Sequence, residues 1–113
     1  MNEYPAKLVR VIDGDTVVLD VDLGFHVTIR ETFRLYGVNA PEMRGEDKGA
    51  GQAAKAFVEQ WFATKTNPVA STYKPRPQDK YGRWLVDVWD SPEAYTALND
   101  ALVAAGHAVR ADA

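Results

Sequence analysis

The sequence predicts an α+β fold that is mainly β, a small barrel with helices packed on it, in the order βββαββα. Three observations lead to this prediction. Apolar residues alternate strictly in the first third of the chain, they change to helical spacing after residue 51, and a second helical stripe begins at residue 97. A chain of 113 residues is long enough for one domain with its own core, so we expect a single domain over residues 1–113.

The first third of the chain predicts an antiparallel meander of strands. Every odd position from Val17 to Ile29 is apolar, which is typical of half-buried strands, and the segment 22–24 (Asp-Leu-Gly) marks a turn between them. The segment before it, KLVRVI (7–12), predicts a strand that ends at turn residues 13–15. The segment 32–38 predicts the next strand.

Two helices and two further strands are predicted after a glycine-rich linker, MRGEDKGAG. Segments 68–73 and 81–89 predict strands, joined by the proline-rich loop YKPRPQDK. The second helical stripe ends at Gly106, a suitable C-terminal cap, while Ser91-Pro92 could begin that helix or form a turn. The first helix is predicted over 51–65, where apolar residues follow helical spacing: Ala54, Phe57, Val58, Trp61 and Phe62.

Composition limits the classes of function. Thirteen basic and sixteen acidic residues give a net charge of −3, so any binding of phosphate must be local. No stretch approaches the roughly 18 apolar residues of a membrane span, and we expect no membrane partner. The absence of cysteine excludes disulfides and thiolate metal sites. The start of the chain shows no signal peptide, which predicts a cytoplasmic or intracellular protein and leaves a secreted mature form open. We also expect a monomer.

The first group that could carry chemistry is Asp13-Gly14-Asp15-Thr16, which places two carboxylates at a strand end. Taken alone, this sequence is typical of a hairpin turn. It does not match an EF-hand loop, because Val17 and Val18 stand where that loop needs an oxygen ligand and a glycine. Binding of a hard cation by one or two of these oxygens stays open.

The second group is FRLYGVNAPE (33–42), and the third is DKYGR (79–83). Arg34 has the opposite parity from its apolar neighbours, so its guanidinium should face away from them across the sheet. Pro41 favours an extended residue before it, which presents Glu42 at the rim. Taken alone, an arginine on a strand and a glutamate in a turn are more typical of a solvated pair, and the third group is typical of a solvated loop.

Together the three groups supply what phosphodiester cleavage needs. A carboxylate base activates water, two arginines neutralise the charge that grows on the phosphoryl oxygens, and a metal ion binds a phosphate oxygen. Arginine suits this task because its planar fork matches two phosphate oxygens and keeps its charge.

The motifs VIDGDTV, FRLYGVNAPE and DKYGR resemble the staphylococcal nuclease (thermonuclease-like) family in order and spacing, over about residues 6–110. The resemblance implies a five-stranded OB-like barrel with two or three helices, and metal-dependent hydrolysis of DNA and RNA. It implies that Arg34 and Arg83 stabilise the phosphoryl transition state and that Glu42 is the general base. It also implies that Lys80 and Tyr81 bind the terminal phosphate of a single-stranded substrate.

The same resemblance implies a Ca²⁺ site, with Asp15 as a direct ligand and Asp13 acting through water. The backbone carbonyl of Ala40 and the side chain of Asn39 complete this set. Asn39 stands where the family usually has an aspartate, and the lost charge should weaken Ca²⁺ binding by on the order of 1–3 kcal/mol. A second departure is Asp112, which falls about where the family has an aromatic platform for a base.

Two functional hypotheses follow. The first is a Ca²⁺-dependent nuclease, favoured by the complete trio of Arg34, Glu42 and Arg83. The alternative is a catalytically weak or inactive OB-like module that binds nucleic acid or protein, favoured by Asn39, the charge of −3 and the missing platform. The complete trio decides for the enzyme.

Overall fold

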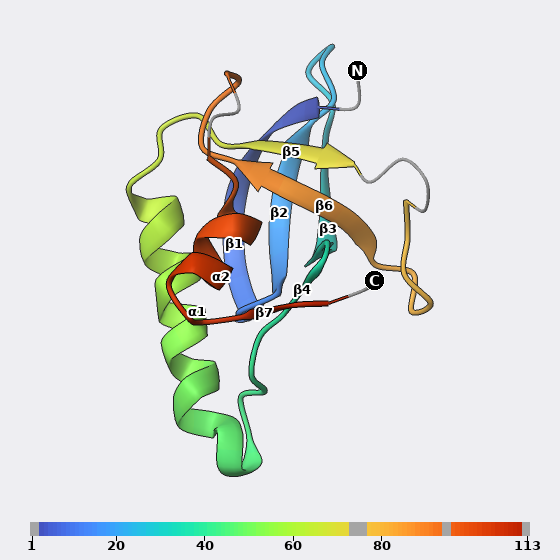
Figure 1. Cartoon of the computed structure of the whole chain (residues 1–113). Coiled ribbons are helices and arrows are strands. Elements are labelled where there is room, and N and C mark those ends of the chain that lie inside the picture. The colour runs from blue at the N-terminus through green and yellow to red at the C-terminus, as the bar shows by residue number, and fades with distance from the viewer. Residues whose placement is uncertain (1–2, 73–76, 94–95, 112–113) are drawn as a thin grey trace.

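The computed structural model describes residues 3–72, 77–93 and 96–111. The predicted order βββαββα is confirmed in them, with two short strands and one 3-10 helix added (Figure 1). The described strands are β1 (Glu3–Asp13), β2 (Thr16–Asp22), β3 (Thr28–Leu35), β4 (Val38–Asn39), β5 (Val69–Thr72), β6 (Trp84–Trp89) and β7 (Val109–Arg110). The described helices are η1 (Gly45–Asp47), α1 (Lys48–Ala63) and α2 (Leu98–Ala104).

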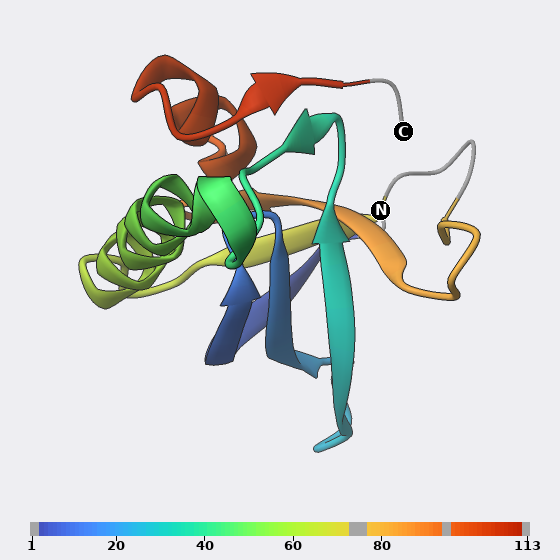
Figure 2. The same ribbon diagram turned by 90° about the horizontal axis from the view of Figure 1, so that it is seen from below.

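Five of the described strands close into a barrel in the order β1-β2-β3-β6-β5, which confirms the predicted five-stranded barrel (Figure 2). Its neighbouring strands are antiparallel except β3 and β6, which pair in parallel. Because side chains alternate along a strand, Val17, Leu19 and Val21 of β2 are buried together with Phe33 and Leu35 of β3. The hydrophobic alternation is therefore the inner face of the barrel from Val17 to Val21, whereas Leu23, Phe25 and Val27 are exposed in the loop between β2 and β3.

Strand β3 differs from the prediction at both ends. It runs without a break from Thr28 to Leu35, so the division into separate strands around residues 29 and 32 was wrong. It also ends before residue 38, because Gly37 adopts φ +77° and turns the chain into β4. The turn predicted at 22–24 is longer than expected, and Phe25 and His26 lie in it at positive φ.

Other boundaries differ because short polar segments have structure of their own. The linker 43–51 contains η1 and the first turn of α1, which begins at Lys48 rather than at residue 51. Strand β6 begins at Trp84 rather than at residue 81, since 79–83 form a tight turn. Ser91-Pro92 form a turn, and α2 begins at Leu98. Part of the predicted loop YKPRPQDK, residues 73–76, lies outside the described residues.

Both helices pack on the barrel and bury apolar faces. Helix α1 lies against β1 (Figure 1) and buries Val58, Trp61 and Phe62. Helix α2 is tied to the barrel by the buried Asn99. Its amide nitrogen donates to the carbonyls of Tyr36 (2.9 Å) and Val86 (3.1 Å), and its amide oxygen accepts from the backbone of Val88 (3.1 Å). These bonds satisfy a buried amide that would otherwise be costly to desolvate.

The described helices include none that is long and apolar enough to cross a membrane.

Candidate functional site

Three segments meet at one end of the barrel: the β1–β2 turn, the end of β3 with β4 and residues 40–42, and the turn before β6. They line a cavity of about 400 Å³, which we call the central cavity. A neighbouring cavity of about 340 Å³, the Tyr81 cavity, shares Arg34, Asn39 and Arg83 with it. The central cavity is lined by Asp13, Asp15, Thr16, Arg34, Asn39, Ala40, Pro41, Glu42 and Arg83. Lys80 and Tyr81 line the Tyr81 cavity, so the structure brings all of the predicted site residues to these two cavities.

Small residues allow these segments to approach one another. A Cβ atom on Gly14 would lie 2.7 Å from the Cβ of Ala54 in α1 and 2.8 Å from the Cβ of Ala40. A Cβ atom on Gly51 would lie 2.1 Å from the carbonyl oxygen of Glu42. The glycine between the two aspartates is therefore required by packing. Helix α1 fixes the backbone that carries Glu42.

Arg34 lies at the centre of a polar network beside the central cavity. Its Nη1 is 2.9 Å from Oδ2 of Asp15 and 3.3 Å from the carbonyl oxygen of Asp15. Its Nη2 donates to the amide oxygen of Asn39. Both charged side chains are largely buried, with 17% of Arg34 and 13% of Asp15 exposed. The guanidinium is therefore held in one orientation from two sides.

Asp15 also holds the corner that contains Ala40. Its Oδ2 accepts a hydrogen bond from the backbone N–H of Ala40 at 2.9 Å, and its Oδ1 accepts one from the hydroxyl of Thr16 at 3.0 Å. Residues 15 and 40 are far apart in sequence, so this carboxylate links the β1–β2 turn to the end of β4.

Arg83 is held by Asp79 within the DKYGR turn. Oδ1 of Asp79 accepts from the backbone N–H groups of Tyr81 and Arg83, both at 2.9 Å. Its Oδ2 accepts from Nε of Arg83 at 2.7 Å. Burial alone would raise the pKa of Asp79, but these hydrogen bonds and the arginine charge outweigh it, and the pKa lies below its usual range. Gly82 adopts φ +81°, which explains the glycine in this motif.

Tyr81 is exposed at the mouth of the Tyr81 cavity, with 72% of its surface accessible. The Nζ atom of Lys80 lies 5.2 Å from the centre of its ring, and the Cζ atom of Arg83 lies 5.3 Å from it. Two cations and an aromatic face are therefore presented together. Such a group is suited to a phosphate next to a base.

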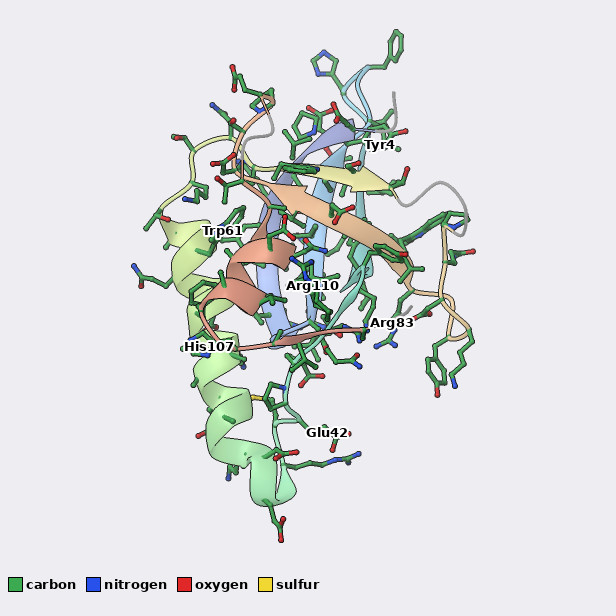
Figure 3. The ribbon with its side chains drawn as sticks, viewed as in Figure 1. Tyr4, Glu42, Trp61, Arg83, His107 and Arg110 are labelled. Carbon is green, nitrogen blue, oxygen red and sulfur yellow. The ribbon has the colours of Figure 1, made fainter. Side chains whose placement is uncertain are left out.

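Glu42 lines the central cavity, and its carboxylate is more exposed than either arginine. Its side chain is 72% exposed, and its Oε2 lies 3.7 Å from Nε of Arg44. Figure 3 shows Glu42 below the barrel and apart from Arg83. The structure thus places Glu42 in the lining of the same cavity as the arginines, with its side chain open to solvent.

The oxygen atoms expected to bind a cation also line the central cavity. They belong to the carboxylates of Asp13 and Asp15, the amide of Asn39 and the backbone of Ala40. Within the described part of the chain, no group of three or more His, Cys, Asp or Glu side chains gathers as a metal cluster. The donor chemistry fits a hard, oxygen-binding cation, although Arg34 is the present partner of Asp15 and Asn39.

Sequence reasoning missed three features of the site. Strand β7 pairs with β4 and sets Val109 opposite Asn39, but a two-residue strand leaves no periodicity to detect. The anchoring role of Asp79 could have been inferred from an acid four residues before an arginine, with a glycine between them. The contact of Gly51 with Glu42 joins elements whose approach the sequence does not specify. Asp112, which falls at the missing aromatic platform, lies outside the described residues.

Comparison with known proteins gives a consistent result. Residues 32–113 match the model of a family described as staphylococcal nuclease homologue. The chain is 31% identical to a thermonuclease of Staphylococcus hyicus over 97 residues, which cover 83% of this chain and 53% of the relative. It is 36% identical to a thermonuclease of Staphylococcus intermedius over 89 residues, 76% of this chain and 49% of the relative. An uncharacterised protein of Methanocaldococcus jannaschii is 27% identical over 125 residues, 93% of this chain and 58% of that protein.

This chain spans about half the length of the curated relatives that it matches. The family model nevertheless covers most of the chain, and two relatives exceed 30% identity over more than two thirds of it. These matches agree with the closed five-stranded barrel found among the described residues. The chain therefore belongs to the staphylococcal nuclease homologue family.

Proposed function

We propose that this protein is a Ca²⁺-dependent nuclease that hydrolyses phosphodiester bonds of single-stranded DNA and RNA in the central cavity. One observation carries the proposal: a single cavity of about 400 Å³ is lined by Glu42, Arg34 and Arg83 together with four oxygen donors. The thermonuclease names of two relatives support the same activity.

Glu42 is the proposed general base. A carboxylate that accepts a proton from water must be within reach of both water and phosphate. Its exposure and its place in the lining of the central cavity meet the first condition and support the second.

Arg34 and Arg83 are proposed to bind the phosphoryl oxygens and to stabilise the negative charge that develops on them. Each guanidinium is oriented by an acidic partner, Arg34 by Asp15 and Arg83 by Asp79. Oriented donors need little reorganisation during the reaction, which is the main source of electrostatic catalysis. The two acidic partners are thus positioning residues.

Asp15, Asp13, Asn39 and the carbonyl of Ala40 are proposed to hold the cation. When bound, Ca²⁺ supplies positive charge to a phosphate oxygen and to the carboxylates that hold it. Asp15 and Asn39 both bond to Arg34, so a bound cation would compete with the guanidinium for these oxygens. Asn39 leaves one carboxylate fewer for the cation, so we expect weak Ca²⁺ binding.

The Tyr81 cavity is proposed to bind the neighbouring nucleotide of the substrate. The ring of Tyr81 provides a face for a base, and Lys80 provides charge for a phosphate. Bases are accessible to such a ring only when they are unpaired. A net charge of −3 offers little attraction to duplex DNA, so single strands should be preferred.

A time course on an end-labelled single-stranded oligonucleotide tests this proposal. We expect cleavage with Ca²⁺, little or none after chelation, and slower cleavage of the matching duplex. Activity that survives complete chelation would remove the metal from the mechanism. Binding of the oligonucleotide without any cleavage would instead favour the non-catalytic module.

A further inference from the structure

A third cavity, of about 270 Å³, adjoins the central cavity. We call it the Val109 cavity. It shares Asn39, Ala40 and Pro41 with the central cavity. The Tyr81 cavity shares a different set with the central cavity, and Asn39 is common to all three. The central cavity shares three residues with each outer cavity, whereas the two outer cavities share only Asn39, so the central cavity lies between them. The remaining lining residues of the Val109 cavity are Asp47, Gly106, His107, Ala108 and Val109.

One small sheet runs beside all three cavities. Strands β4 and β7 pair Asn39 with Val109, so these two side chains lie on the same face of the sheet. The chain continues to Ala111, whose backbone N–H donates to the carbonyl of Gly37 at 2.9 Å and which lines the Tyr81 cavity. Figure 3 shows this C-terminal segment passing from His107 toward Arg83. The segment thus connects the two outer cavities.

The chemistry of the Val109 cavity differs from that of its neighbours. Val109 is 65% exposed, so its apolar side chain is available for contact with a ligand. The ring of His107 packs on Phe57, with the ring centres 5.0 Å apart, which fixes the imidazole at the wall. The described residues that line this cavity include no lysine or arginine, and they do include Asp47. This surface is unsuited to a phosphate and suited to the uncharged part of a nucleotide.

We propose that the Val109 cavity binds a nucleoside of the substrate strand, on the opposite side of the scissile phosphate from the Tyr81 cavity. This inference rests on the proposed nuclease function and extends it. Val109 and Pro41 provide apolar contact for a base or sugar, and His107 and Asp47 provide polar partners for its edge. A strand that occupies all three cavities continues on both sides of the bond that is cleaved. The protein should therefore cleave internal bonds in preference to terminal ones.

The test compares two substrates and four proteins. One substrate is a single-stranded oligothymidylate, which can fill all three cavities. The other is a thymidine 5′-(p-nitrophenyl phosphate) diester, which carries a nucleoside on one side of the phosphate only. The proteins are the wild type, Val109→Asp, Val109→Thr and the control Val27→Asp. Val27 is also an exposed valine, but it lies in the loop between β2 and β3, away from the cavities.

We expect Val109→Asp to lower kcat/KM for the oligonucleotide by about tenfold more than for the diester, since it sets a negative charge beside the strand. Val109→Thr keeps the branched shape in β7, so it should fold like the wild type and cause a smaller change with the same substrate dependence. Val27→Asp should change neither value. Equal losses on both substrates, or no loss on either, would overturn the inference.

Failure of the nuclease function itself would give a different result. Wild-type protein would then cleave neither substrate, even with Ca²⁺. Fluorescence anisotropy of a labelled oligothymidylate tests the cavity in that case, because strand binding does not require cleavage. Weaker binding by Val109→Asp than by Val27→Asp would support the cavity, and equal binding by the two variants would overturn it.

Discussion

Arg34 and Asp15 form an ion pair whose Nη1 and Oδ2 atoms lie 2.9 Å apart, and both side chains are largely buried. The same two residues are expected to have opposite partners in the reaction, a phosphate for the arginine and a cation for the aspartate. Without a phosphate and a cation, the charges of Arg34 and Asp15 neutralise each other. Under the proposed function, a cation bound at Asp15 would compete with Arg34 for the same carboxylate.

Replacement of Arg34 by Ala should therefore have two effects. Turnover should fall by roughly 10²–10⁵, the usual loss when a transition-state donor is removed. Calcium should bind more tightly, by about tenfold, because Asp15 and Asn39 lose a competing cation. Kinetics and titration calorimetry measure the two effects.

Arg30→Ala is the matched control, since Arg30 lies two alternation periods away on β3 and forms an exposed ion pair with Asp20. Neither turnover nor calcium affinity should change in it. Wild-type turnover in Arg34→Ala would show that Arg34 has a structural role only.

Asn39→Asp should tighten calcium binding by about 10- to 100-fold, because it adds a carboxylate to a cation site that has few. The concentration of Ca²⁺ for half-maximal cleavage should fall with it. The new carboxylate also adds repulsion toward Asp13, Asp15 and Glu42, although Arg34 is within hydrogen-bonding reach of this position. Asp15→Asn should shift the affinity the other way. Unchanged affinity in Asn39→Asp would mean that the corner at residues 39–40 does not bind calcium.

Gly51→Ala, compared with Gly49→Ala, tests whether the position of Glu42 affects catalysis independently of the stability of α1. A methyl group there would lie 2.1 Å from the carbonyl oxygen of Glu42, so residues 42–43 must move. We expect kcat to fall by about tenfold or more, because small displacements of a catalytic group are costly. Gly49→Ala is the control, since its added methyl group meets nothing within 4 Å. It should stabilise α1 by up to about 1 kcal/mol and leave kcat unchanged. Equal kcat in the two variants would contradict the contact.

Asp87 gives a prediction for pH dependence. Burial, and then repulsion from Asp100, raises its pKa above the usual range, while Arg110 opposes this shift. A raised pKa in the folded state means that the stability gained from the protonated form is present below the unfolded pKa of about 3.9 and is lost as pH rises through the folded pKa. Asp87→Asn should therefore raise the unfolding midpoint at pH 7, and the difference should shrink toward zero as pH approaches 4. A constant difference across this range, measured by thermal unfolding, would contradict the assignment.

The sequence predicted the features of this molecule that depend on local pattern. Alternation from Val17 onward is the inner face of β2, and the helical stripe containing Val58 and Trp61 is the buried face of α1. The predicted parity of Arg34 is also confirmed, because Phe33 and Leu35 belong to the hydrophobic core and Arg34 lines the central cavity. These features follow from residue spacing alone.

What the sequence could not predict depends on contacts between distant segments. The parallel pairing of β3 with β6 joins Phe33 to Trp84, and nothing in either segment specifies the other. The approach of Gly51 to Glu42 is set by how α1 packs on β1. The Val109 cavity likewise exists only because β7 returns to β4. Motifs indicated which residues belong to the site, and the fold determines what orients them.

The most direct test of the central claim is the rate of single-stranded DNA cleavage, with saturating Ca²⁺, by Glu42→Gln beside Glu46→Gln. Glu46 is an exposed acid in the same segment, and it does not line the central cavity. If Glu42 activates water in that cavity, its replacement should lower kcat by roughly 10²–10⁴ while Glu46→Gln keeps the wild-type rate. Wild-type rates in both variants would contradict the assignment of the central cavity as the active site.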